Sequence, residues 1–142
     1  MIEKRAKHSC AKMEINGSVY VVVVGGYHRK TVELLNVSHA RGQNWFKGPS
    51  LPENVHGASL LTSPTGKSVI LIGGCSGRFN VSNKLFELSG DSTSNLKWHV
   101  MDQTLVNPRS SHLSHYLSFE NTHYMENQYI HLKPNNQQAL CF

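Results

Sequence analysis

The sequence predicts an all-β fold built from consecutive four-stranded antiparallel sheets. An apolar run that ends in Gly25-Gly26 returns 48 residues later as the run that ends in Gly73-Gly74, and Trp45 returns 53 residues later as Trp98. Each copy contains four short segments rich in β-branched or aliphatic residues, and helical periodicity is absent. Repeats of about fifty residues with four strands each are typical of β-propeller blades. We therefore expect a partial β-propeller of two blades plus the start of a third.

The first copy begins with partial alternation of polar and apolar residues over residues 8–15, which predicts a strand. Asn16-Gly17 favours the tight hairpin turn that needs positive φ angles. The β-branched run Val19–Val24 predicts a strand buried on both faces. Val32–Val37 and the segment around Trp45-Phe46 supply the third and fourth strands.

The second copy follows the same order. Its four strands are expected in residues 56–61, 69–72, 85–88 and 98–101, and the turn at residues 64–67 joins the first two. No segment in this copy has the length or the spacing of an amphipathic helix.

The copies divide the chain into residues 1–53, 54–106 and 107–142. The third part begins like the other two at Asn107-Pro108-Arg109 but never reaches a Gly-Gly pair. After Tyr116 the chain is rich in Asn, Gln and His, with few apolar residues in register, so we expect an incomplete third repeat followed by a disordered tail.

The size of the chain limits what it does alone. At 142 residues with 39% hydrophobic content it is long enough for one core. A propeller blade, however, buries its faces against neighbouring blades, and two blades leave one face open on each side. We therefore expect the module to need further blades or another chain to complete the propeller.

Charge and cysteine content favour a cytoplasmic protein with an acidic partner. The net charge is +5, from 14 Lys and Arg against 9 Asp and Glu, without the motifs that mark nucleic-acid binding. Cys10, Cys75 and Cys141 lack metal-knuckle spacing and are expected to be reduced thiols. The sequence shows no signal-peptide pattern and no apolar run long enough to span a bilayer, so we expect no membrane association.

Several of these markers resemble the Kelch repeat. In the first copy the resemblance rests on Arg5-x-x-His8, Asn16-Gly17, Gly25-Gly26, Val32-Glu33-x-x-Asn36, Trp45 and Leu51-Pro52, and in the second on His56-Gly57, Gly66, Gly73-Gly74, Leu85-Phe86 and Trp98. It implies a protein-binding module such as a fragment of the substrate-recognition subunit of a cullin-type ubiquitin ligase. Actin binding, which some Kelch proteins show, and a truncated product without activity of its own are the alternatives.

One rim of such a blade pair should carry the binding loops. Because strand direction reverses at every step, the loop between the second and third strands emerges at the same end as the connection between blades. The residues expected on this rim are Arg5, Tyr27, His28, Arg29, Lys30, Arg78, Phe79 and Arg109. Guanidinium groups and aromatic anchors suit an acidic or phosphorylated protein segment. The alternative is an ordinary polar loop surface without a partner.

The nine histidines do not predict a metal site. His112-x-x-His115 has loose spacing, and His112 falls at the blade position of His8 and His56, which gives it a structural explanation. The chain also lacks a nucleophile elbow, a paired-carboxylate motif and a phosphate-binding glycine loop. We therefore expect no metal, no cofactor and no enzymatic activity.

Overall fold

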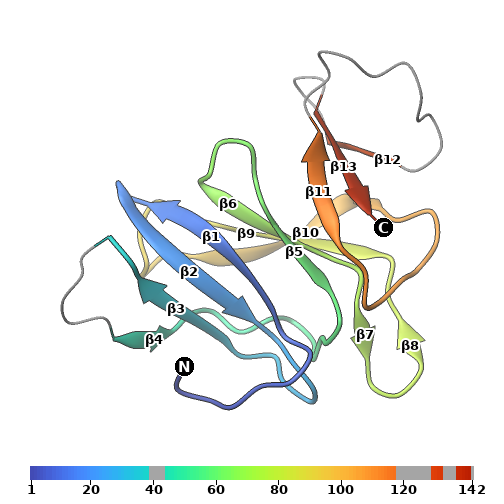
Figure 1. The fold of residues 1–142 in the computed structure, drawn as a ribbon, viewed down its shortest axis with the longest axis horizontal. Coiled ribbons are helices and arrows are strands. Elements are labelled where there is room, and N and C mark those ends of the chain that lie inside the picture. Colours follow the sequence, from blue (N-terminus) through green and yellow to red (C-terminus); the bar gives the residue numbers. More distant parts are fainter. Residues whose placement is uncertain (39–43, 118–128, 133–136, 142) are drawn as a thin grey trace.

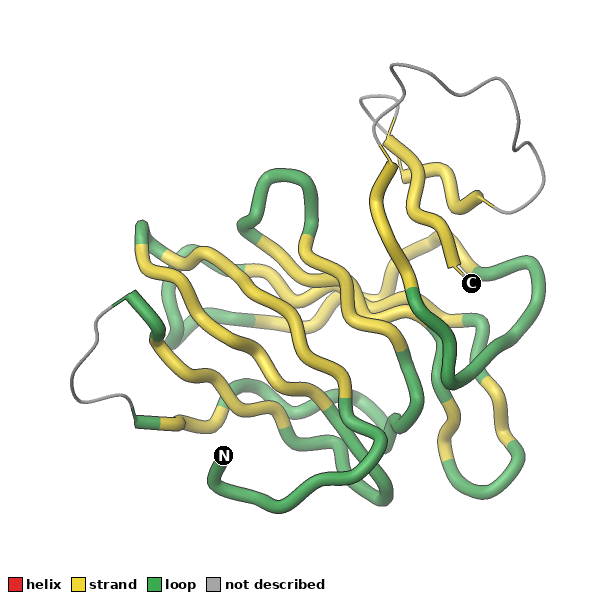
Figure 2. Tube along the Cα trace, in the orientation of Figure 1, coloured by secondary structure: helices red, strands yellow, loops and turns green. Residues whose placement is uncertain are grey.

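The computed structural model describes residues 1–38, 44–117, 129–132 and 137–141, and within these ranges the protein is all-β (Figures 1 and 2). This confirms the predicted fold class. The described residues form strands, turns and loops and contain no helix that is long and apolar enough to cross a membrane.

The first sheet contains β1 (Ser9–Ile15), β2 (Ser18–Val24), β3 (Val32–Asn36) and β4 (Trp45–Lys47), in that order and with every pair antiparallel. Asn16 and Gly17 connect β1 to β2 with φ angles of 49° and 73°. These angles belong to the type I′ hairpin turn, which matches the right-handed twist of the two strands. The predicted hairpin is therefore present.

The second sheet repeats this order with β5 (Ser59–Thr62), β6 (Ser68–Ile72), β9 (Lys84–Ser89) and β10 (Lys97–Thr104). Its strands also pair antiparallel in sequence order. A small hairpin of β7 (Cys75–Ser76) and β8 (Asn80–Val81) is inserted between β6 and β9 and stands apart from both sheets (Figure 1).

A third sheet follows the second in the chain. It consists of β11 (Ser114–Leu117), β12 (Tyr129–Leu132) and β13 (Gln137–Cys141), with β13 in the middle. Two strands thus lie in the segment for which the sequence predicted no regular structure. The rest of that predicted tail, residues 118–128, 133–136 and 142, lies outside the described residues.

The main core lies between the first and second sheets. Buried side chains on alternate positions of the strands face each other across this interface, as the two-residue period of a strand requires. They include Met13, Val22, Val24 and Leu34 from the first sheet and Val69, Leu71, Phe86 and Leu88 from the second. A second cluster of Ile70, Ile72, Leu85 and Leu105 covers the other face of the second sheet. Every residue of β6 is therefore buried. In β2, for which the sequence predicted burial on both faces, the second half of the strand is buried but Val19 is 38% exposed.

The connections between strands repeat as closely as the strands do. Four backbone hydrogen bonds around the first sheet have counterparts around the second. Around the first sheet they run from Gly26 N to Val55 O, Tyr27 N to Ala6 O, Leu51 N to Lys30 O and Gly57 N to Lys7 O. The counterparts around the second sheet, in the same order, run from Gly74 N to Arg109 O, Cys75 N to His56 O, Leu105 N to Asn83 O and Ser111 N to Gly57 O. These bonds join loops distant in sequence, so the two copies share a three-dimensional structure as well as a sequence pattern.

This repetition corrects one detail of the sequence alignment. Lys7, Gly57 and Ser111 occupy equivalent positions, each with a positive φ of 55°, 63° and 57° respectively. His8 and His112 each follow one of these residues, as predicted. His56 was expected at the same position as His8 and His112, but it precedes Gly57 and is equivalent to Ala6. The carbonyl oxygen of Ala6 accepts a hydrogen bond from Tyr27 N, and that of His56 accepts the equivalent bond from Cys75 N.

The paired glycines allow the connections to approach each other closely. Gly73 and Gly74 have φ angles of 61° and 97°, a region that side chains disfavour. A Cβ atom on Gly73 would also lie 2.5 Å from the carbonyl oxygen of Arg109, and one on Gly74 would lie 2.6 Å from a methyl carbon of Val55. A Cβ atom on Gly25 would likewise clash with the carbonyl oxygen of Val55. Glycine is therefore required for steric as well as conformational reasons.

The two tryptophans have different surroundings. Trp98 packs against the main core and donates its indole N–H to the carbonyl oxygen of Pro49 at 3.0 Å, so it joins the second sheet to the connection from the first. Trp45, the counterpart of Trp98 in the sequence repeat, lies differently. Its neighbour Phe46 packs against the core, so Trp45 points to the opposite face of the first sheet, away from the second.

Candidate interaction rim

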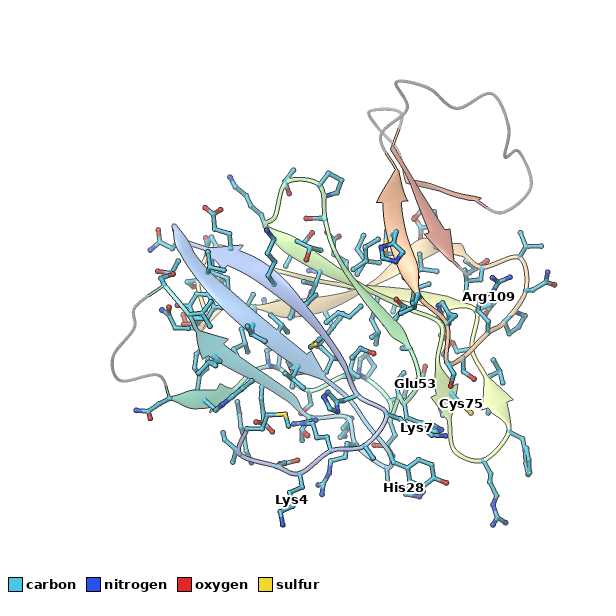
Figure 3. All side chains as sticks on the ribbon, viewed as in Figure 1. Lys4, Lys7, His28, Glu53, Cys75 and Arg109 are labelled. Carbon is cyan, nitrogen blue, oxygen red and sulfur yellow. The ribbon has the colours of Figure 1, made fainter. Side chains whose placement is uncertain are left out.

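Three connections meet at one end of the two sheets. The loop between β2 and β3 approaches the segment that precedes β1 through the hydrogen bond from Tyr27 N to Ala6 O at 2.9 Å. It approaches the connection that precedes β5 through the bond from Gly26 N to Val55 O, also at 2.9 Å. Lys7 and His28 lie at this same end (Figure 3). We call this end the rim.

Tyr27 is the centre of an aromatic cluster on the rim. Its ring lies 4.5 Å from that of His28 and 4.9 Å from that of His56, measured between ring centroids. The ammonium group of Lys7 lies 6.0 Å from the centre of the Tyr27 ring, at the limit of a cation–π interaction. Burial, together with the positive charges of Lys7 and His28, lowers the pKa of His56 below its ordinary value. This shift favours the neutral form of the His56 ring.

Arg29 and Lys30 extend this surface. Both side chains are exposed. The guanidinium group of Arg29 lies 3.2 Å from a carboxylate oxygen of Glu3, which also pairs with Lys47 at 3.7 Å. No acidic side chain of the described residues pairs with Lys30. The loop between β2 and β3 therefore presents positive charge to solvent.

Arg78 and Phe79 lie at the tip of the β7–β8 hairpin, and both are exposed. The base of the hairpin reaches the rim because Cys75 and His56 form an antiparallel bridge, and His56 contacts Tyr27. Figure 3 shows Cys75 at the same end of the molecule as Lys7 and His28. The structure thus connects the two predicted loops through His56, a residue that the sequence analysis did not place on the rim.

Arg5 was expected on the exposed rim but is buried. Its side chain has no exposed surface and forms a salt bridge of 2.7 Å with Glu33, which is also fully buried. Its guanidinium group donates further hydrogen bonds to the carbonyl oxygens of Gly25 and Thr31. Arg5 therefore holds the loop between β2 and β3 in place and does not face a partner.

Glu33 is the anchor for this arrangement, and the sequence analysis assigned it no such role. Its carboxylate accepts hydrogen bonds from the backbone N–H groups of Ile2 and Glu3 as well as from Arg5. Burial by itself raises the pKa of Glu33, but these hydrogen bonds and the charge of Arg5 outweigh it and hold the pKa below the ordinary value. The sequence offered one sign of this role, which is that Glu33 is an acidic residue within the otherwise apolar start of strand β3 (Val32–Asn36).

Arg109 is half-buried and belongs to the connection before β11. Its carbonyl oxygen accepts a hydrogen bond from Gly74 N, and its own N–H donates to Ser82 O. Arg109 is therefore the counterpart of Val55, whose carbonyl oxygen accepts the equivalent bond from Gly26 N. It lies beside the loop between β6 and β9, whereas Val55 lies beside the loop between β2 and β3.

The described residues contain no cluster of three or more His, Cys, Asp or Glu side chains that could hold a metal ion. His112 packs beside Gly73, and neither of its ring nitrogens has a hydrogen-bond partner among the described residues. Burial and the nearby charge of Arg109 lower its pKa.

No model of a known protein family matches this sequence, and no curated protein matches it either.

Proposed function

We propose that the chain is a Kelch-type β-propeller segment that binds a partner protein through its rim. The observation that carries the proposal is the repetition of the inter-strand connections: the same backbone hydrogen bonds recur around both sheets, and the glycine pairs recur with them. Blades of a propeller repeat in this way because each stacks on the next by the same contacts. The Kelch-like markers of the sequence add to this support.

The proposed binding surface consists of Tyr27, His28, Arg29, Lys30, Arg78 and Phe79, to which the structure adds Lys7 and His56. Arg5 is excluded because its side chain is buried, whereas Arg109 is half-buried beside the loop that carries Arg78 and Phe79 and stays a predicted rim residue. Positive charge on exposed loops around an aromatic centre suits an acidic or phosphorylated segment of a partner protein. We propose a partner of this class.

The cellular role that we propose is substrate recognition for a cullin-type ubiquitin ligase in the cytoplasm. Cys10 and Cys75 are both free thiols, which suits a reducing compartment. The rest of this assignment comes from the resemblance to Kelch proteins. Completing the propeller requires further blades or a second chain, since one face of the first sheet is not covered by another sheet of the described residues.

Affinity capture with a double variant tests the rim. Arg29→Ala with Arg78→Ala removes two exposed positive charges from the proposed surface. The matched control is Lys67→Ala with Lys97→Ala, which removes the same charge from two exposed positions at the other end of the second sheet, just before β6 and at the start of β10. We expect the rim variant to lose its captured partners by about tenfold or more, as quantified by mass spectrometry, and the control to retain them.

Equal capture by the wild type and both variants would remove the rim from the proposal. Capture of actin, followed by co-sedimentation with filaments that the rim variant abolishes, would instead support actin association. A chain that captures no protein at all would support the view of a truncated product without activity of its own.

A further inference from the structure

The β7–β8 hairpin exposes an aromatic side chain that does not contribute to the core. Phe79 is 87% exposed, in a turn that begins with Gly77 at a φ of 84°. Turn positions favour small and polar residues, and an exposed Phe adds nothing to folding. Single exposed apolar residues are common on protein surfaces, whereas several of them together, bordered by polar residues, are typical of contact sites for other molecules.

Hydrogen bonds of the hairpin fix the backbone that carries Phe79. The two strands of the hairpin pair through Cys75 with Val81 and Ser76 with Asn80, and the Asn80 side chain donates a hydrogen bond to Ser76 Oγ at 3.0 Å. Ser82 N donates to the carbonyl oxygen of Gly74 at 2.8 Å and closes the base. A group held in this way loses little conformational entropy on binding.

Two further exposed apolar residues belong to the same region. Val81 follows Phe79 on β8, and Val106 is 93% exposed in the connection after β10. The hydrogen bonds from Leu105 N to Asn83 O and from Arg109 N to Ser82 O hold this connection against the end of the hairpin. We call Phe79, Val81 and Val106 the hairpin patch.

Positive charge borders the hairpin patch. Arg78 is exposed next to Phe79, and no acidic side chain of the described residues pairs with it. The contacts of His56 with Cys75 and Tyr27 connect the hairpin to the cationic rim loop. A segment bound along this path therefore meets apolar surface and positive charge in succession.

We propose that the hairpin patch anchors an aliphatic or aromatic side chain of the acidic protein segment that binds the rim, with Phe79 as the central contact. This inference rests on the proposed function and specifies its partner: acidic residues alone are not sufficient, and an apolar residue beside them is recognised as well. A protein segment suits the surface better than a membrane does, because the exposed polar residues Arg78 and Asn80 flank Phe79 at the tip of the hairpin, whereas membrane-surface binding needs a continuous apolar face.

A display library of random 12-residue peptides, selected on the immobilised full-length chain, tests the inference without a known partner. We expect the wild-type chain to enrich peptides that carry acidic residues next to an aliphatic or aromatic residue. The Phe79→Ser variant is expected to enrich acidic peptides without the apolar residue. The matched control is Val100→Ser, which changes another exposed apolar residue, 65% exposed on β10.

Fluorescence anisotropy with one enriched peptide then gives the size of the effect. We expect Phe79→Ser to weaken binding by about tenfold or more and Val100→Ser to leave it unchanged. Replacing the apolar residue of the peptide by Ser should weaken binding to the wild type by a similar factor and have no further effect on the Phe79→Ser variant. Unchanged thermal unfolding of both variants excludes misfolding as the cause.

The outcomes separate this inference from the proposed function. Enrichment of acidic peptides that lack an apolar residue, or equal binding by Phe79→Ser, overturns the inference and leaves the acidic rim intact. No enrichment of acidic peptides overturns both. Binding of vesicles of phosphatidylserine and phosphatidylcholine that depends on Phe79 would show that the hairpin patch contacts lipid instead, and would also overturn the inference.

Discussion

At the scale of single residues, the buried ion pair of Arg5 and Glu33 is costly to break. Both side chains are fully buried, and the carboxylate also accepts two backbone hydrogen bonds. Taking such a pair out of water is expensive, but breaking it is more so, because one charge is then left without its counterion. In the second copy the equivalent positions are Val55 and Phe86, which both lie in the main core. The same two positions therefore hold an ion pair in one copy and apolar side chains in the other.

We predict that Glu33→Gln lowers the free energy of unfolding by about 3 kcal/mol at pH 7, because it leaves the buried guanidinium of Arg5 uncompensated. Chemical denaturation measures the loss. Glu14→Gln, which removes an exposed carboxylate from β1, is the control and should change the free energy by no more than about 0.5 kcal/mol.

The difference between wild type and Glu33→Gln should also depend on pH. The pKa of Glu33 is lower in the folded state than its ordinary value of 4.5, so the unfolded state binds more protons at acidic pH. The stability that ionised Glu33 contributes is therefore complete above pH 4.5 and is lost as the pH falls through the lowered folded-state pKa. A difference that stays constant down to that range would contradict the role assigned to this carboxylate.

Sequence could identify Glu33 as unusual but not its partner. A carboxylate within an apolar strand needs compensation, and this much follows from the sequence. Arg5 lies 28 residues earlier, and only the fold brings the two together. For the same reason Arg5 was expected among the exposed rim residues: basic residues near chain connections are usually solvated, and burial depends on tertiary contacts.

At the scale of strands, the predictable elements are those with periodic apolar residues. The strands of both four-stranded sheets overlap the expected segments, because burial on one or both faces leaves a pattern in the sequence. One difference is β5, which begins at Ser59 and not at residue 56, since Gly57 has a positive φ that a strand does not use. The β7–β8 hairpin was expected only as a loop. Its strands have two residues each and pair with one another, so they bury no face and leave no such pattern.

Trp98 makes a connection between the sheets that can be measured. We predict that Trp98→Phe lowers the free energy of unfolding by about 1–2 kcal/mol. The substitution removes the hydrogen bond to Pro49 O, and the smaller Phe ring fills less of the space that Trp98 occupies against the main core. Trp45→Phe is the matched control, because Trp45 points away from the second sheet. Equal losses in the two variants, determined by chemical denaturation, would argue against a special role for Trp98.

At the scale of the whole molecule, the first and second sheets share one core. Side chains from β1, β2 and β3 pack against those from β6 and β9, and the connection between the sheets supplies Leu51 and Val55 to the same cluster. Neither sheet buries these residues alone. Stability in repeat architectures comes largely from such interfaces between neighbouring units, so the sheets depend on each other for folding.

We therefore predict that the two sheets unfold in a single cooperative transition. Far-ultraviolet circular dichroism follows the strands of both sheets, whereas tryptophan fluorescence reports mainly on Trp98 at their interface and on Trp45 in the first sheet. In a thermal or denaturant titration of the full chain the two signals should have the same midpoint, as in a two-state transition. Trp98→Phe should shift both midpoints together. Two separated transitions would mean that each sheet is stable on its own, and a gradual loss of β signal without a transition would mean that the chain needs further blades or a second chain in order to fold.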